Sequence, residues 1–162
     1  MSFRDMDRII EESNLWLELC YAGNYAATIH VARRALERGE LDRIVLGTDT
    51  PAGTGITPRG MLRTLGLVSS LGGVPPEMAL CLATGNVARA HHLDSGFIAP
   101  DKPADLVIMG KIQGCQSKDN LDVLRIGNMM GVSLIIIDGK IRIRERSFQT
   151  PPPLTKAIIK KE

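Results

Sequence analysis

The stretch "RIVLGTDTPAGTGITPRGMLRTLG", residues 43–66, decides how this chain folds. It opens with a short apolar run, reaches the lone carboxylate Asp49, and passes through a loop rich in glycine and proline before a helical pattern begins at Met61. Two interpretations compete for it. One is a glycine loop that cradles a phosphate group, and the other is an acid that follows a buried strand and serves an active site.

The elements around this stretch predict an α/β fold. Apolar periodicity and capping residues predict helices over residues 3–13, 24–38 and 61–71. Short apolar runs predict buried strands over residues 15–20 and 43–46. Strands that alternate with helices at this spacing predict right-handed βαβ connections and a parallel sheet.

The pattern changes beyond Leu93. Two further helices are predicted before it, one opened by Pro75-Pro76 and one capped by Thr84. After it, residues 94–110 predict two short strands, and Asp138-Gly139 predicts a type I′ turn between two apolar arms of a hairpin. A short helix is expected after the final proline run. Neither half makes a complete sheet, so each is expected to be part of a larger structure.

Composition excludes several classes of function. The chain has 162 residues, 20 basic and 18 acidic side chains, and 4% aromatic residues, so it has neither a basic surface nor stacking platforms for nucleic acid. No apolar run is long enough to span a membrane, and the charged N-terminus is not a signal peptide. The three cysteines form no CxxC pair, and Cys20 and Cys81 are expected to be buried free thiols. We therefore expect a soluble cytoplasmic protein without nucleic-acid or membrane partners.

The residues alone leave both interpretations of the loop open. Gly53-Thr54-Gly55 is a weak phosphate signal because Ile56-Thr57-Pro58 replaces the tight turn into the helix, and no GK[ST] follows. A nucleotide-binding module therefore stays a third hypothesis. Asp49 can ligate a cation or accept a proton, and it can equally cap its own loop through an Asx turn.

The histidines do not form a recognisable metal motif. His30 falls inside a predicted helix, whereas His91 and His92 are adjacent at a helix end, where their side chains diverge. No HxH or HExxH spacing occurs in the sequence. The chain is therefore not expected to build a metal site alone.

Three motifs carry a family resemblance. They are "VLGTDTP" at residues 45–51, "LATGNVARAHHLDSGFIAPDKPADLVIMG" at 82–110 and "VSLIIIDGKI" at 132–141. Together they resemble the C-terminal part of the amidohydrolase superfamily, and within it the enamidases, a group that acts on a cyclic amide in nicotinate breakdown. The resemblance implies the last strands and helices of a (β/α)8 TIM-like barrel over residues 1–93, part of a small β-sandwich over 94–150, and a tail over 151–162.

The same resemblance assigns roles to a few residues. Asp49 matches the aspartate of the last barrel strand, which ligates a divalent metal (zinc, with or without iron) and accepts the proton of the attacking water. Thr54 and Gly55 are candidate substrate contacts. The resemblance implies a small cyclic amide as substrate and a homo-oligomer at full length, with the N-terminal barrel half absent, so the chain is expected to be inactive alone. A non-catalytic partner that completes a split barrel is the alternative.

Overall fold

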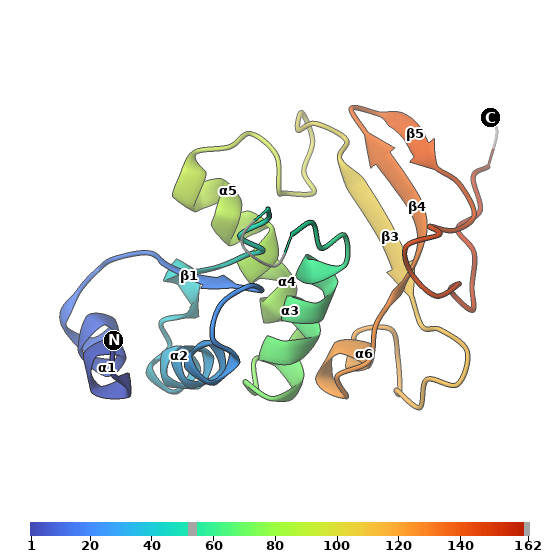
Figure 1. Cartoon of the computed structure of the whole chain (residues 1–162). Helices are drawn as coiled ribbons and strands as arrows, with labels where there is room; N and C mark the ends of the chain where they lie inside the picture. Colours follow the sequence, from blue (N-terminus) through green and yellow to red (C-terminus); the bar gives the residue numbers. More distant parts are fainter. Residues whose placement is uncertain (52–54, 161–162) are drawn as a thin grey trace.

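The computed structural model of the chain describes residues 1–51 and 55–160. Figure 1 shows helices gathered around a two-stranded sheet at the N-terminal side and a three-stranded sheet at the C-terminal side. The elements, in chain order, are α1 (Phe3–Glu12), β1 (Leu17–Cys20), α2 (Tyr25–Arg38), the 3-10 turn η1 (Leu41–Arg43), β2 (Ile44–Gly47), α3 (Gly60–Ser70), α4 (Pro76–Ala83), α5 (Gly85–His91), β3 (Leu106–Gly110), α6 (Asp122–Arg125), β4 (Gly131–Ile137) and β5 (Lys140–Ile143).

The first sheet confirms the predicted parallel pairing. β1 and β2 run parallel, with Cys20 opposite Gly47, and α2 connects them. Asn24 begins α2 because its side chain accepts a hydrogen bond from the backbone N–H of Ala27 at 3.1 Å. Gly39 ends the helix in the left-handed conformation that glycine adopts without strain.

The hydrophobic core lies between this sheet and the helices. Ile44 and Leu46 of β2 pack into the same buried cluster as residues of α1, α2, α3 and α4. The side chains that anchor these helices are almost fully buried: Ile10, Ala32, Ala35, Val68, Ala79 and Leu82. α1 and α2 are also joined by ion pairs, and α6 packs against α3.

The second sheet is antiparallel, with strand order β3-β4-β5. The predicted hairpin is confirmed, because Asp138 and Gly139 both have positive φ, at 51° and 68°, as a type I′ turn requires. The C-terminal segment pairs with the chain just after β3: Leu154 donates its N–H to the carbonyl of Lys111 at 2.7 Å, and Ile112 bridges to Pro153.

Several local predictions were wrong. Residues 94–105 form turns rather than a first strand, since Gly96 and Asp101 both have positive φ. The described part of the tail is irregular rather than helical, because Pro153 and Leu154 pair with Ile112 and Lys111 and bends follow them. β1 begins at Leu17 rather than residue 15.

Two further differences concern a thiol and a helix. Cys81 was expected to be buried but is exposed, because it lies on the outer face of α4. The short helix α6 was not predicted. In the part of the chain that the structure describes, no helix is both long enough and apolar enough to span a bilayer.

Candidate functional site

Asp49 lies at the carboxyl ends of the two parallel strands. β2 ends at Gly47, and two residues later Asp49 adopts a φ of 53° that turns the chain out of the strand. Its side chain is exposed, and within the described residues it takes part in no ion pair or hydrogen bond. A carboxylate in this position can accept a proton or ligate a cation.

The loop after Asp49 is closed by a short polar contact. The hydroxyl oxygens of Thr50 and Thr57 lie 2.9 Å apart, which brings the two ends of the loop together. Thr54, a predicted substrate contact, lies outside the described residues, as does Gly53. Gly55 is exposed with a φ of 74°, a conformation that favours glycine, so the turn alone accounts for its identity.

The strand face below Asp49 carries two groups that sequence reasoning did not single out. Glu18 and Cys20 alternate with the buried Leu19 and so lie on the opposite face of β1. The side chain of Glu18 extends across Gly47, which has no Cβ to obstruct it. The alternation of polar and apolar residues in LELC indicates the two faces of a strand. Only the register with β2 shows that Glu18 and Cys20 lie beside the end of that strand.

Cys20 is not an activated nucleophile. Burial raises the pKa of its thiol, and the nearby carboxylates of Glu18 and Asp49 raise it further. A thiol with a raised pKa is protonated at neutral pH, and the thiolate is the nucleophilic form. The charged groups near this thiol are therefore the carboxylates of Glu18 and Asp49.

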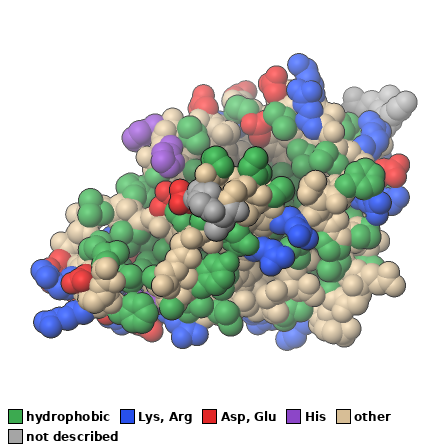
Figure 2. Space-filling view, viewed as in Figure 1, with side chains coloured by type: hydrophobic (Ala, Val, Ile, Leu, Met, Phe, Trp, Pro, Cys, Tyr) green, Lys and Arg blue, Asp and Glu red, His purple; other side chains and the backbone are tan. Residues whose placement is uncertain are grey.

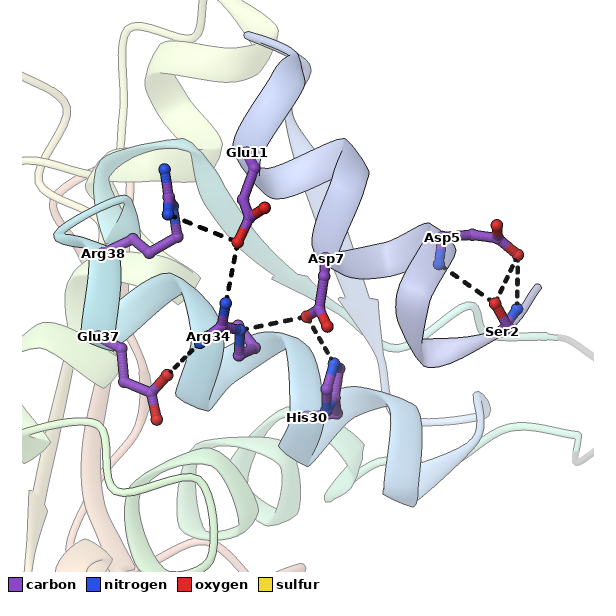
Figure 3. A network of polar contacts seen from close by, with 8 residues as sticks. All are labelled: Ser2, Asp5, Asp7, Glu11, His30, Arg34, Glu37 and Arg38. Carbon is purple, nitrogen blue, oxygen red and sulfur yellow. Dashed lines mark hydrogen bonds and ion pairs between the residues drawn. The ribbon is translucent and has the colours of Figure 1, made fainter.

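His30 has a structural role in the interface between α1 and α2. Its Nε2 lies 2.8 Å from Asp7 Oδ1, and its ring stacks on Phe3 with centroids 4.4 Å apart. Figure 3 shows that Asp7 also accepts a hydrogen bond from Arg34, which in turn reaches Glu11. These contacts engage His30 in the interface between α1 and α2.

The other two histidines lie at the C-terminal end of α5, where both are exposed. Figure 2 shows the histidine side chains on the surface over α5. Among the described residues, no group of three or more His, Cys, Asp or Glu side chains is arranged to hold a metal ion. Asp49 thus fits a metal as a single carboxylate ligand, and the described residues do not complete a ligand set.

Comparison with known proteins decides the family. Residues 4–142 match the model of the Amidohydrolase family. The chain belongs to the amidohydrolase family. Among curated relatives, the chain is 39% identical to the enamidase of Eubacterium barkeri over 159 residues, which are 98% of the chain and 41% of the enamidase. It is 26% identical to adenine deaminase 1 of Desulfotalea psychrophila over 121 residues, 72% of the chain and 18% of the deaminase.

Solved structures agree with this assignment. The amidohydrolase chain superimposes on a crystal structure of enamidase with a TM-score of 0.92 and 38% identity, covering 96% of the chain and 40% of the enamidase. A β-aspartyl dipeptidase of Fervidobacterium islandicum AW-1 shares the fold at a TM-score of 0.63 and 18% identity, over 94% of the chain and 36% of the dipeptidase. The chain thus spans about two-fifths of the length of enamidase.

Proposed function

We propose that this chain is the C-terminal part of a metal-dependent hydrolase that cleaves the carbon–nitrogen bond of a cyclic amide, as an enamidase. The observation that carries the proposal is an exposed carboxylate, Asp49, at the carboxyl ends of parallel strands in a chain 39% identical to an enamidase. Functional groups of parallel α/β barrels lie at this end of the strands.

The proposal includes the architecture implied by the sequence. Residues 1–93 are the last strands and helices of a (β/α)8 barrel, 94–150 belong to a β-sandwich and 151–162 form a tail. The parallel pair β1–β2 with its helices supports the first assignment, and the antiparallel sheet β3-β4-β5 supports the second. The remaining barrel strands and metal ligands come from an N-terminal part, and the complete enzyme is a homo-oligomer.

Asp49 has two tasks in this proposal. Its carboxylate holds a divalent cation and accepts the proton of the water that attacks the amide carbon. It then returns this proton to the ring nitrogen as the carbon–nitrogen bond breaks, so the ring opens to a carboxylate and an amine. When bound, zinc, with or without iron, supplies Lewis acidity that polarises the amide carbonyl. Thr54 and Gly55 contact the substrate from the loop.

Two other functions compete. A non-catalytic partner that completes a barrel encoded in two pieces would have the same fold, and co-expression with a chain that carries an HxH motif would then restore activity. A nucleotide-binding module would use Gly53–Gly55, but α3 begins at Gly60, so the glycines do not lead directly into its N-terminus. The absence of a melting shift with ATP or NAD would remove this third possibility.

The test of the proposal is Asp49→Asn in the complete enzyme, with Asp42→Asn as the matched control. The two aspartates lie at opposite ends of β2, and both are exposed. We expect Asp49→Asn to keep the fold but lower kcat for a six-membered cyclic enamide by about 10²- to 10⁴-fold, the range for loss of a general base. Asp42→Asn should stay within about twofold of the parent, because it lies at the opposite end of the strand. Near-normal turnover of Asp49→Asn would refute the assigned role.

A further inference from the structure

The face of β1 that carries Glu18 brings a second carboxylate to the Asp49 loop. Glu18 alternates with the buried Leu19, so its side chain leaves the core on the same face of the strand as Cys20. The register pairs Cys20 with Gly47, and Asp49 follows Gly47 by two residues. Each of the two parallel strands therefore supplies one carboxylate to the edge of the sheet where functional groups of such folds lie.

Gly47 shows where the carboxylate of Glu18 lies. A Cβ added to Gly47 would lie 1.8 Å from Glu18 Oε1, 2.9 Å from Cδ and 3.4 Å from Cγ of the same side chain. Glu18 is paired with Val45, so its side chain leans from there toward the carboxyl end of β2. Gly47 has no positive φ that would require glycine, and the space that its missing Cβ leaves is occupied by the Glu18 side chain.

Glu18 and Asp49 lie within reach of one small molecule. The Cα atoms of Gly47 and Asp49 are at most about 7 Å apart, because two residues of chain cannot span more. The thiol of Cys20 supports this closeness: burial raises its pKa first, and the carboxylates of Glu18 and Asp49 both raise it further. A small ring that reaches Asp49 therefore also meets Glu18.

Glu18 is free to accept a hydrogen bond from a ligand. Its side chain is exposed, and the ion pairs formed within residues 1–51 and 55–160 do not involve it. An ionised carboxylate is an acceptor only, so its natural partner is an N–H or O–H donor. Such a carboxylate costs free energy if it is enclosed without a donor.

We propose that Glu18 accepts a hydrogen bond from the ring N–H of the cyclic amide and thereby selects amides against esters. The inference rests on the proposed function, in which Asp49 returns a proton to the same ring nitrogen. That nitrogen must lie within hydrogen-bond reach of Asp49. The carboxylate beside Asp49, over Gly47, is then the acceptor for the N–H that the nitrogen already carries.

This contact strengthens as the ring opens. The nitrogen gains positive charge when it receives the proton from Asp49 and the carbon–nitrogen bond breaks, and a neighbouring carboxylate stabilises that charge more than it stabilises the neutral amide. Glu18 itself transfers no proton and keeps its charge throughout. An ester has a ring oxygen in this position, whose lone pairs face the carboxylate, so the same side chain disfavours it.

The experiment compares two substrates of the complete enzyme: a six-membered cyclic enamide, and the enol lactone of the same ring, in which oxygen replaces N–H. Glu18→Ala should lower kcat/KM for the enamide about 10- to 100-fold, the range for loss of a hydrogen bond to a charged group. For the lactone, kcat/KM should be unchanged or higher. Glu18→Gln keeps an acceptor oxygen without the charge, so its enamide value should fall between those of the parent and Glu18→Ala.

Two further variants test the geometry and the specificity of the effect. Gly47→Ala displaces the Glu18 carboxylate without removing it, so it should lower enamide turnover as Glu18→Ala does. It should have little further effect once residue 18 is alanine, because the two changes remove the same contact. Glu77→Gln, at an exposed glutamate of α4, is the matched control and should stay within about twofold of the parent for both substrates.

The outcomes distinguish this inference from the proposed function. Asp49→Asn should slow both substrates, whereas Glu18→Ala should slow the enamide alone and leave the metal content unchanged. If the complete enzyme opens neither ring, the proposed function and this inference both fail. If it opens the enamide but Glu18→Ala slows both substrates equally or loses metal, or if Gly47→Ala and Glu18→Ala have additive effects, the inference about Glu18 alone is overturned.

Discussion

Strands β2 and β3 are nearly equal in apolar character but differ in burial. β2 reads IVLG, and three consecutive residues, Ile44, Val45 and Leu46, are each at most 4% exposed. β3 reads LVIMG, yet its consecutive residues Val107 and Ile108 are 53% and 42% exposed. Successive side chains of a strand point to opposite faces, so β2 is covered on both faces and β3 is open on both faces near this position.

The difference follows from what the chain places next to each strand. In the sequence, α2 precedes β2 and α3 follows it. Val68 of α3 and Leu82 of α4 lie in the same buried cluster as the β2 side chains. β3 is reached through a turn-rich segment and pairs with β4, which leads into a tight hairpin, and no helix of the described residues packs extensively against either strand. An apolar sequence thus predicts a strand, whereas the connections decide how much of that strand is buried.

The comparison predicts unequal costs for the same substitution in the two strands. Ile44→Ala should lower the free energy of unfolding by about 2–5 kcal/mol, because a fully buried isoleucine leaves a cavity in the core. Ile108→Ala should cost about 1 kcal/mol or less, since 42% of that residue is already exposed. Chemical denaturation of both variants measures the difference. Equal costs would mean that β3 is covered in solution and that the comparison fails.

A pair of glycines sharpens the comparison within the second sheet. Gly110 and Gly131 lie opposite each other in β3 and β4. A Cβ at Gly131 would lie 2.6 Å from the carbonyl oxygen of Pro151 and 2.7 Å from the nitrogen of Pro153, whereas at Gly110 it would lie 3.5 Å from Asn120 Oδ1. Gly131→Ala should destabilise the protein by about 1–3 kcal/mol and release the tail from the sheet.

Gly110→Ala is the matched control and should change stability by about 0.5 kcal/mol or less. Limited proteolysis of the tail reports its release more directly than denaturation does. If both alanine variants keep a protected tail, the contact between the proline run and β4 does not hold the tail on the sheet.

The smallest expected effect concerns α6, which packs against α3 between the two regions. The pKa of Asp122 is lowered from 3.8, first by the backbone N–H of Lys118 and then by Arg125. Because the folded state favours the carboxylate, the stabilisation is fully present above pH 3.8 and is lost as pH falls through the lower pKa of the folded state.

Asp122→Asn should therefore unfold at a lower temperature than the parent at pH 7, and the two should converge as the pH falls below the lowered pKa of Asp122. Thermal unfolding followed by circular dichroism across this range measures it, with Asp42→Asn as a control that removes an exposed carboxylate. A difference that stays constant from neutral pH to the acid end of the titration would show that the carboxylate form is not what stabilises α6.

The parts of the fold that sequence predicted are those with local signals. Asn24 and Gly39 mark both ends of α2, and Asp138-Gly139 fixes the hairpin turn whatever surrounds it. The errors lie where distant backbone decides. The tail is not helical because Leu154 bonds to the carbonyl of Lys111, and residues 94–105 form turns where Gly96 lies close against Thr84 and Ala88.

The same distinction between local signals and long-range contacts applies to the candidate site. The place of Asp49 could be predicted because it follows a strand signal directly, although its role remains a proposal. Glu18 and Cys20 share its face through the register of β1 with β2, which no local pattern contains. A surface hollow lined by Tyr21, Arg63 and Asn128 likewise joins three segments that meet only in the folded chain.

The most direct test of the central claim is the intact mass of the protein purified from its source cells, measured together with its metal content. The account predicts a species roughly two and a half times heavier than 17.6 kDa, since the chain matches 41% of enamidase, and it predicts bound zinc or iron that Asp49→Asn weakens. A species of 17.6 kDa that carries no divalent metal, alone or with a partner chain, would contradict it.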